Sequence, residues 1–260
     1  MRRRVRPFIH TCERHLPLGS FGLSRPRKYP TPENSCEAKC VTWTRFSVRA
    51  DDADLCKRIL ASIAIVYRPI TLEELTSLVM LEDMADDLES LREIVSLCGS
   101  FLTIRQGTIY FVHQSAKDFL FAKAYNKIFP SGTEEAHYIA FSRSLQAMSK
   151  SLRRDMYSLR ESGYPAEQVK QPDPDPLAAS RYSCIYWIDH LCDWNPSSSA
   201  KHKVNLRDGG AVESFLRQQY LYWLEALSLC KSISQGVVAM TRLETVVEVN
   251  RLCLCIITIC

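Results

Sequence analysis

One short stretch constrains the fold of this chain more than any other feature, namely FLTIRQGTIYF at residues 101–111. Two β-rich runs flank Gln106-Gly107, and this spacing predicts a tight hairpin. If Arg105 faces Thr108 across the turn, alternate side chains divide into an apolar face and a more polar face. The apolar face would consist of Leu102, Ile104, Ile109 and Phe111. Such a hairpin is half-buried, so neighbouring segments must cover it.

Three helical patterns precede the hairpin and can supply that cover. Apolar residues between positions 55 and 66 predict a first helix, which ends before Arg68-Pro69. Thr71 with Glu74 has the spacing of a capping box and starts a second helix. Apolar residues from 88 to 98 recur by three and four, which predicts a third helix. Three helices followed by a hairpin is the order of a winged helix, and we place this domain at residues 51–128.

The polar triplet His113-Gln114-Ser115 follows the hairpin and precedes another helical pattern. Ser115, with Asp118 three residues later, has the spacing of a helix N-cap, so a structural role explains this serine without nucleophilic chemistry. His113 has the same parity as Ile109, so we expect it at the covered edge of the hairpin with a satisfied hydrogen bond. A hydrolase acting through His113 and Ser115 is the alternative interpretation.

Charge along the chain argues against DNA binding, a common role of winged helices. Residues 51–128 hold 8 basic and 12 acidic side chains. A DNA-binding winged helix places its third helix in the major groove, where positive charge is needed. The third helix here has one cation, Arg92, among four acidic residues, which are Asp86, Asp87, Glu89 and Glu93. We therefore expect no nucleic-acid partner for this domain.

The first segment, residues 1–50, has a different character. It holds 11 Lys/Arg and 3 Asp/Glu, several prolines and no sustained apolar period, so we expect a largely disordered basic segment. One interpretation is that it is foreign to the domain that follows. A transit peptide or a basic nucleic-acid arm is an alternative. A zinc site is a further alternative, although the spacing matches no common finger. Its ligands would come from His10, Cys12, His15, Cys36 and Cys40.

The cysteines and the apolar end of the chain indicate the cellular compartment of the protein. Eleven cysteines, an odd number, are scattered along a chain without a secretory signal, so we expect reduced thiols and a cytoplasmic protein. Residues 246–260 form an apolar end that is too short to cross a bilayer, which takes about 20 residues. We expect no membrane partner, and we interpret this end as truncated.

The second half of the chain, residues 133–245, has helical patterns throughout. A proline-rich linker near residues 163–178 predicts an extended connector. Large aromatic side chains on the helices around it are compatible with a bundle or with a solenoid-like stack. The fold class that follows is mainly α, with a winged-helix domain that contains one short β-hairpin and is followed by a helical region.

Four phrases, in this order, closely resemble fungal NACHT-domain proteins, which are signal-transduction NTPases related to vegetative-incompatibility proteins and NOD-like receptors (the STAND NTPase group). The phrases are YRPITLEEL from residue 67, IVSLCGSFLTIRQGTIYFVHQSAKDFL from 94, DPLAASRYSCIYWIDHL from 175 and FLRQQYLYWLEALSL from 215. In that family this stretch follows the nucleotide-binding core. The resemblance implies a winged-helix region and a helical segment that leads to repeats.

The resemblance also implies a function and its limits. The sequence has no G-x-x-x-x-G-K-[ST] motif, so we expect a non-enzymatic regulatory fragment without a cofactor or metal of its own. ADP or ATP would be bound by the full-length relatives, and His113 matches a histidine that senses nucleotide in related switches. Partners would be an NTPase core and C-terminal repeats in the same chain, or homologous chains. A stand-alone protein–protein interaction adaptor is the alternative.

Overall fold

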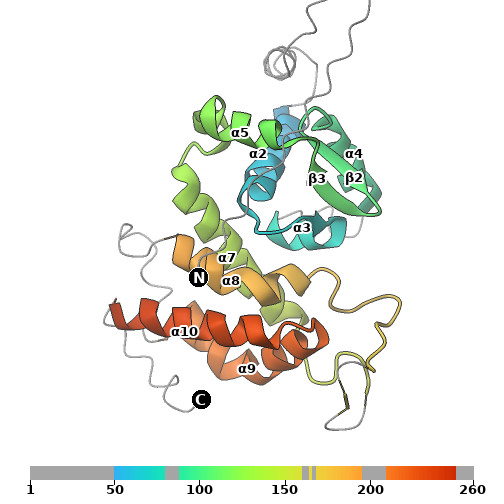
Figure 1. Ribbon diagram of the computed structural model, residues 1–260, viewed down its shortest axis with the longest axis vertical. Coiled ribbons are helices and arrows are strands. Elements are labelled where there is room, and N and C mark those ends of the chain that lie inside the picture. The colour runs from blue at the N-terminus through green and yellow to red at the C-terminus, as the bar shows by residue number, and fades with distance from the viewer. Residues whose placement is uncertain (1–49, 80–87, 160–163, 166–167, 195–208, 250–260) are drawn as a thin grey trace, which may run out of the picture.

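The computed structural model of the chain describes residues 50–79, 88–159, 164–165, 168–194 and 209–249. These residues form a winged-helix domain and a helical region, which lie one above the other in Figure 1. The predicted fold class, mainly helical with a winged helix first, is confirmed.

The winged helix combines helices with short strands. They are α2 (Ala50–Ile65), β1 (Ile70–Thr71), α3 (Leu72–Leu78), α4 (Leu88–Leu97), β2 (Leu102–Arg105) and β3 (Thr108–Phe111). The sheet has the strand order β1-β3-β2, with both pairings antiparallel. The sequence predicted only the hairpin, whereas the structure adds β1 as a third strand by pairing Ile70 with Ile109.

The hairpin has the predicted register. Leu102 faces Phe111 and Arg105 faces Thr108 across the turn. Ile109 is 1% exposed whereas its neighbour Tyr110 is 39% exposed, so the apolar face does point to the core. Gln106 and Gly107 both have positive φ, at 50° and 75°, as the favoured two-residue hairpin turn requires.

Two short helices lead from the wing to the second half, namely α5 (Gln114–Ala122) and α6 (Tyr125–Ile128). The helical region then comprises α7 (Gly132–Ser151), α8 (Arg181–Asp193), α9 (Ala211–Leu229) and α10 (Ile233–Val249). Helix α7 packs against α8 and α9, α10 packs against the same two helices, and α8 contacts α9, so the four helices form one packed group (Figure 1). The sequence analysis did not single out α10, which extends past the predicted limit at residue 245.

Two hydrophobic cores meet at α7 and α8. Ala140 of α7 belongs to the winged-helix core, while the next residue, Phe141, belongs to the core of the helical region. Tyr182 of α8, which is fully buried, also packs into the winged-helix core. The helical region therefore completes the core of the winged helix, and the two parts share a continuous packed boundary.

Candidate functional site

The wing ends at a histidine that starts the next helix. His113 has extended backbone and is the N-cap of α5, and its Nδ1 accepts a hydrogen bond of 3.2 Å from the backbone N–H of Ser115. This corrects the prediction that Ser115 is the N-cap with Asp118 as its capping-box partner. Helix α5 starts two residues earlier than predicted, at Gln114, and the side-chain amide of Gln114 donates to Asp118 at 3.0 Å.

The cap also fixes what the His113 ring can offer. Because Nδ1 accepts from the backbone, the proton of the neutral ring is assigned to Nε2. His113 is exposed, not buried at the covered edge as its parity predicted, because the chain leaves the sheet at Phe111. Within the described part of the chain, no residue bonds to Nε2. The wing therefore ends in an exposed N–H donor, which is able to bind an anionic oxygen.

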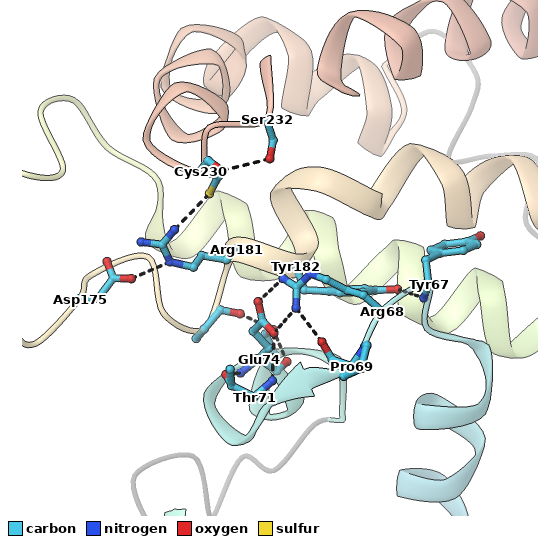
Figure 2. A network of polar contacts seen from close by, with 12 residues as sticks. Tyr67, Arg68, Pro69, Thr71, Glu74, Asp175, Arg181, Tyr182, Cys230 and Ser232 are labelled. Carbon is cyan, nitrogen blue, oxygen red and sulfur yellow. Dashed lines mark hydrogen bonds and ion pairs between the residues drawn. The ribbon is translucent and has the colours of Figure 1, made fainter. Parts of the chain in front are cut away.

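An ion pair between the half-buried Arg68 and the buried Glu74 holds the turn between α2 and β1. The Arg68 guanidinium donates to both Glu74 carboxylate oxygens, at 2.8 and 2.5 Å, and Glu74 is 2% exposed (Figure 2). Glu74 also accepts from the Thr71 N–H, and the Thr71 hydroxyl accepts from the Glu74 N–H, so the predicted capping box is present. Two-pronged pairing of this kind fixes the direction of both side chains.

The same turn is bound to the helical region. The Arg68 guanidinium lies 5.4 Å from the centre of the Tyr182 ring on α8. The backbone N–H of Tyr67 donates to the Tyr182 hydroxyl at 3.3 Å, and the Tyr67 hydroxyl donates to Asp193 at 2.6 Å. The Ser77 hydroxyl of α3 donates to the carbonyl of Ala179, just before α8. Figure 2 shows Tyr67 and Arg68 of this turn beside Tyr182 of α8. We call the contacts of residues 67–77 with residues 179–193 the junction.

Two histidines extend the junction into the helical region. The His190 Nε2 lies 2.8 Å from the Tyr182 hydroxyl, and its Nδ1 lies 2.9 Å from the Nδ1 of His137 on α7. One Nδ1 must donate and the other accept, so a neutral pair satisfies this contact. Burial, with a smaller contribution from His137, lowers the pKa of His190 to about 3. Burial also lowers the pKa of His137, against the attraction of Asp193. Both rings are therefore neutral at neutral pH.

A second polar cluster anchors the start of α8. The Arg181 Nε donates to Asp175 at 2.7 Å, and its other nitrogens contact the Tyr157 hydroxyl and the Cys230 sulfur. The Tyr157 hydroxyl donates to the other Asp175 oxygen at 2.8 Å. Burial raises the pKa of the Tyr157 hydroxyl and of the Cys230 thiol. This cluster ties the connector before α8 to the turn between α9 and α10, which Figure 2 shows beside the junction.

The structure does not bring the predicted site residues together. His113 lies at the end of β3, whereas Thr71 and Glu74 lie at the start of α3. The junction residues Arg68, Tyr182 and His190 were not predicted as a site. The contacts of Tyr182 with the turn at residues 67–68 join positions more than 100 residues apart, and local spacing carries no signal for such pairs.

The described surface of α4 has the predicted acidic character. Glu89 and Glu93 are exposed, and Arg92 lies 3.4 Å from Glu89. Asp86 and Asp87 lie outside the described residues. The expectation that this helix does not bind nucleic acid stays a prediction.

The remaining predictions from the sequence concern a zinc site, the state of the cysteines and a membrane span. The residues of the possible zinc site, from His10 to Cys40, lie outside the described residues. Among the described residues, no cluster of three or more His, Cys, Asp or Glu side chains is placed to hold a metal ion. Described cysteines 56, 98, 184, 192 and 230 are free thiols. In the part of the chain that is described, no helix is both long and apolar enough to span a membrane.

Comparison with known proteins defines the class first. Residues 44–130 match the family described as GPI inositol-deacylase, winged helix domain. The matched stretch is therefore a winged-helix domain by sequence, and its described residues have that fold. This match begins seven residues before the start at residue 51 that the sequence pattern predicted. No solved structure matches the chain significantly.

A curated relative then shows the ancestry. Vegetative incompatibility protein HET-E-1 from Podospora anserina is 54% identical over 236 residues, which cover 86% of this chain. The chain is thus a homologue of HET-E-1, and the resemblance to NACHT-type vegetative-incompatibility proteins is confirmed. It spans 17% of the relative's length. Residues 51–245 make up three quarters of the chain, so the similarity also includes part of the flanking segments.

Proposed function

We propose that the chain is a non-enzymatic regulatory segment of a NACHT-type signal-transduction NTPase. In the full-length protein it would couple the state of a bound nucleotide to self-association. The homology to HET-E-1 and the winged-helix fold support this class of function. The coupling itself, the nucleotide and the partners belong to the proposal.

The junction is the observation that carries the proposal. A regulatory segment must transmit a displacement of its winged helix to the elements beyond it. Here Arg68 is held by the buried Glu74 and lies against the ring of Tyr182, so the turn after α2 and the helix α8 are fixed to each other. Because packed interfaces of this kind switch between discrete arrangements, a shift at the wing would move the helical region as a body.

His113 gives the wing a means of sensing the nucleotide. Its exposed Nε2–H is suited to a phosphate oxygen, and the cap contact from Ser115 fixes the ring in that tautomer. A NACHT core in the same chain would supply ADP or ATP. We assign His113 no catalytic role in this chain, because the contact of its Nδ1 with the Ser115 N–H is that of a helix cap.

The test fuses this chain to the nucleotide-binding core of a NACHT-domain protein. Sedimentation velocity should show a monomer with ADP and a larger assembly with a non-hydrolysable ATP analogue. Tyr182→Ala removes the ring that faces Arg68 and should shrink the difference between the two nucleotides, whereas the exposed-site control Lys123→Ala should not. A fused protein whose sedimentation is the same with both nucleotides would contradict the proposal.

A further inference from the structure

A cavity lies where the winged helix meets the helical region, on α2, the end of α3 and the loop before α7. Its volume is about 220 Å³. Most of its wall is apolar and comes from both parts of the molecule. The apolar wall includes Ala61, Ile65, Leu78, Ile128, Phe129 and Ala136. An apolar cavity at a boundary between two packed parts is a common place for a small ligand.

The charged side chains of this cavity are mostly basic. Lys57, Arg58, Lys127 and Arg143 line it, together with the carboxylates of Asp54 and Glu135. Within the described part of the chain, neither Lys57 nor Lys127 forms an ion pair with another residue. Their ammonium groups therefore remain available at the rim. The positive end of the α7 dipole, at Gly132, adds charge of the same sign.

We propose that this cavity binds a small amphipathic anion, an apolar chain that ends in a carboxylate. The apolar wall would take the chain out of water, and the ammonium groups of Lys57 and Lys127 would pair with the carboxylate. A neutral molecule of the same shape would gain only the burial of its apolar chain. A cationic one would be repelled by the two ammonium groups. Because one water occupies about 30 Å³ of liquid, the cavity fits about seven or eight carbon-sized groups. Octanoate has this size and charge.

Binding there would affect the arrangement of the two parts. The ligand would touch Ala61 on α2 and Ala136 on α7, which belong to the winged helix and to the helical region. A ligand that binds only when these walls are together stabilises that arrangement by mass action. The site therefore offers a means of control that is separate from the nucleotide contact proposed for His113.

The experiment compares three probes on the full 260-residue protein, namely octanoate, octanol and octylammonium. Calorimetric titration should give an affinity for octanoate about tenfold higher than for octanol, and the weakest affinity for octylammonium. The double substitution Lys57→Gln with Lys127→Gln should bring octanoate within about twofold of octanol. Lys123→Gln, at an exposed lysine that does not line the cavity, is the matched control and should change neither affinity.

Each of three results would overturn the proposal. Equal affinities for octanoate and octanol in the unmodified protein would mean that the lysines do not favour a carboxylate. An octanoate preference that survives the double lysine substitution would place the binding elsewhere. Ala136→Phe fills the cavity and should abolish binding of octanoate and octanol alike, and retained binding would also count against this site. If that variant does not fold, the lysine variants decide the question.

Discussion

At the end of the wing, an imidazole nitrogen of His113 does what a serine or aspartate oxygen does at most helix N-caps, since it accepts the N–H of the second helical residue. The ring is exposed, so this contact is screened by water and its contribution to stability is at the low end for a cap. Ser115, which the spacing favoured as the cap, instead supplies the backbone donor and a hydroxyl 2.9 Å from Nδ1.

Substitutions at His113 and Ser115 should change stability as expected if the histidine, and not the serine, is the N-cap. His113→Ala removes the cap acceptor and should lower the free energy of unfolding by about 0.5–1 kcal/mol. His113→Asp supplies a cap oxygen and should be close to neutral. Ser115→Ala leaves the backbone donor in place and should cost less than His113→Ala. Urea unfolding of the three variants measures this, and a larger loss for Ser115→Ala than for His113→Ala would restore the serine as the cap.

His190 makes stability depend on pH. Its pKa in the folded protein, about 3, lies below the ordinary value of 6.5, so the unfolded chain binds the extra proton first as pH falls. The folded state is therefore fully stable with respect to this group above about pH 6.5 and loses stability between there and pH 3. The loss between pH 7 and pH 5 should be about 2 kcal/mol. The urea midpoint of the unmodified protein should fall as the pH is lowered from 7 to 5, and the midpoint of His190→Gln should fall less. Equal falls in the two proteins would contradict the prediction.

Residues whose contacts are local in the sequence could be predicted, whereas residues whose partners are distant in the sequence could not. The capping box of Thr71 and Glu74 was predictable because both partners lie within one turn of helix. The cap at His113 was missed because histidine is an unusual cap, and because the helix starts two residues earlier than a cap at Ser115 implies. Arg68 and Tyr182 could not be paired from the sequence, since their contact exists only once the two cores have formed.

At the scale of elements, the hairpin was predictable and the third strand was not. The hairpin has a strong local signal, an alternating apolar pattern around Gln-Gly. Strand β1 has only two residues, Ile70 and Thr71, and it exists because β3 offers it an open edge. Helix α10 carries apolar side chains on its exposed side as well, with Val237 and Val238 more than 60% exposed, so its pattern did not stand out.

The hairpin turn gives a direct test at this scale. Gly107 has φ of 75° and no atom near the position of an added Cβ, so Gly107→Ala meets backbone strain without a clash. The cost should be about 1–2 kcal/mol. Gln106, with φ of 50°, is better served by asparagine, so Gln106→Asn should raise the free energy of unfolding slightly. Urea unfolding of both variants should show opposite shifts, and a neutral Gly107→Ala would mean that the turn is not of this type.

At the scale of the whole molecule, two cores share α7 and α8. Ala140 and Phe141 are neighbours in the chain and pack into different cores, so neither core is complete without this helix. The boundary at residues 128–133 that the sequence suggested therefore separates the two parts along the chain but not in their packing.

Shared helices should make unfolding cooperative. Trp187, Trp194 and Trp223 all lie in the core of the helical region, so tryptophan fluorescence reports chiefly on that region. Far-UV circular dichroism reports on all helices. In a Trp43→Phe background, which removes the remaining tryptophan, the two urea transitions should coincide. A fluorescence transition that is complete while helical signal persists would show that the two parts unfold independently.

The central claim is that this chain senses a nucleotide through its wing and passes the state on through the junction. The most direct measurement is the rate of ADP release from the fusion with a NACHT core, with and without His113→Ala. A contact that exists only in the closed state shifts the equilibrium by its own free energy. Removal of the imidazole should therefore speed ADP release several-fold, while Gln114→Ala, at the next exposed position, should leave the rate unchanged. Equal release rates with and without His113 would mean that this histidine only caps α5, and the proposed sensing role would be wrong.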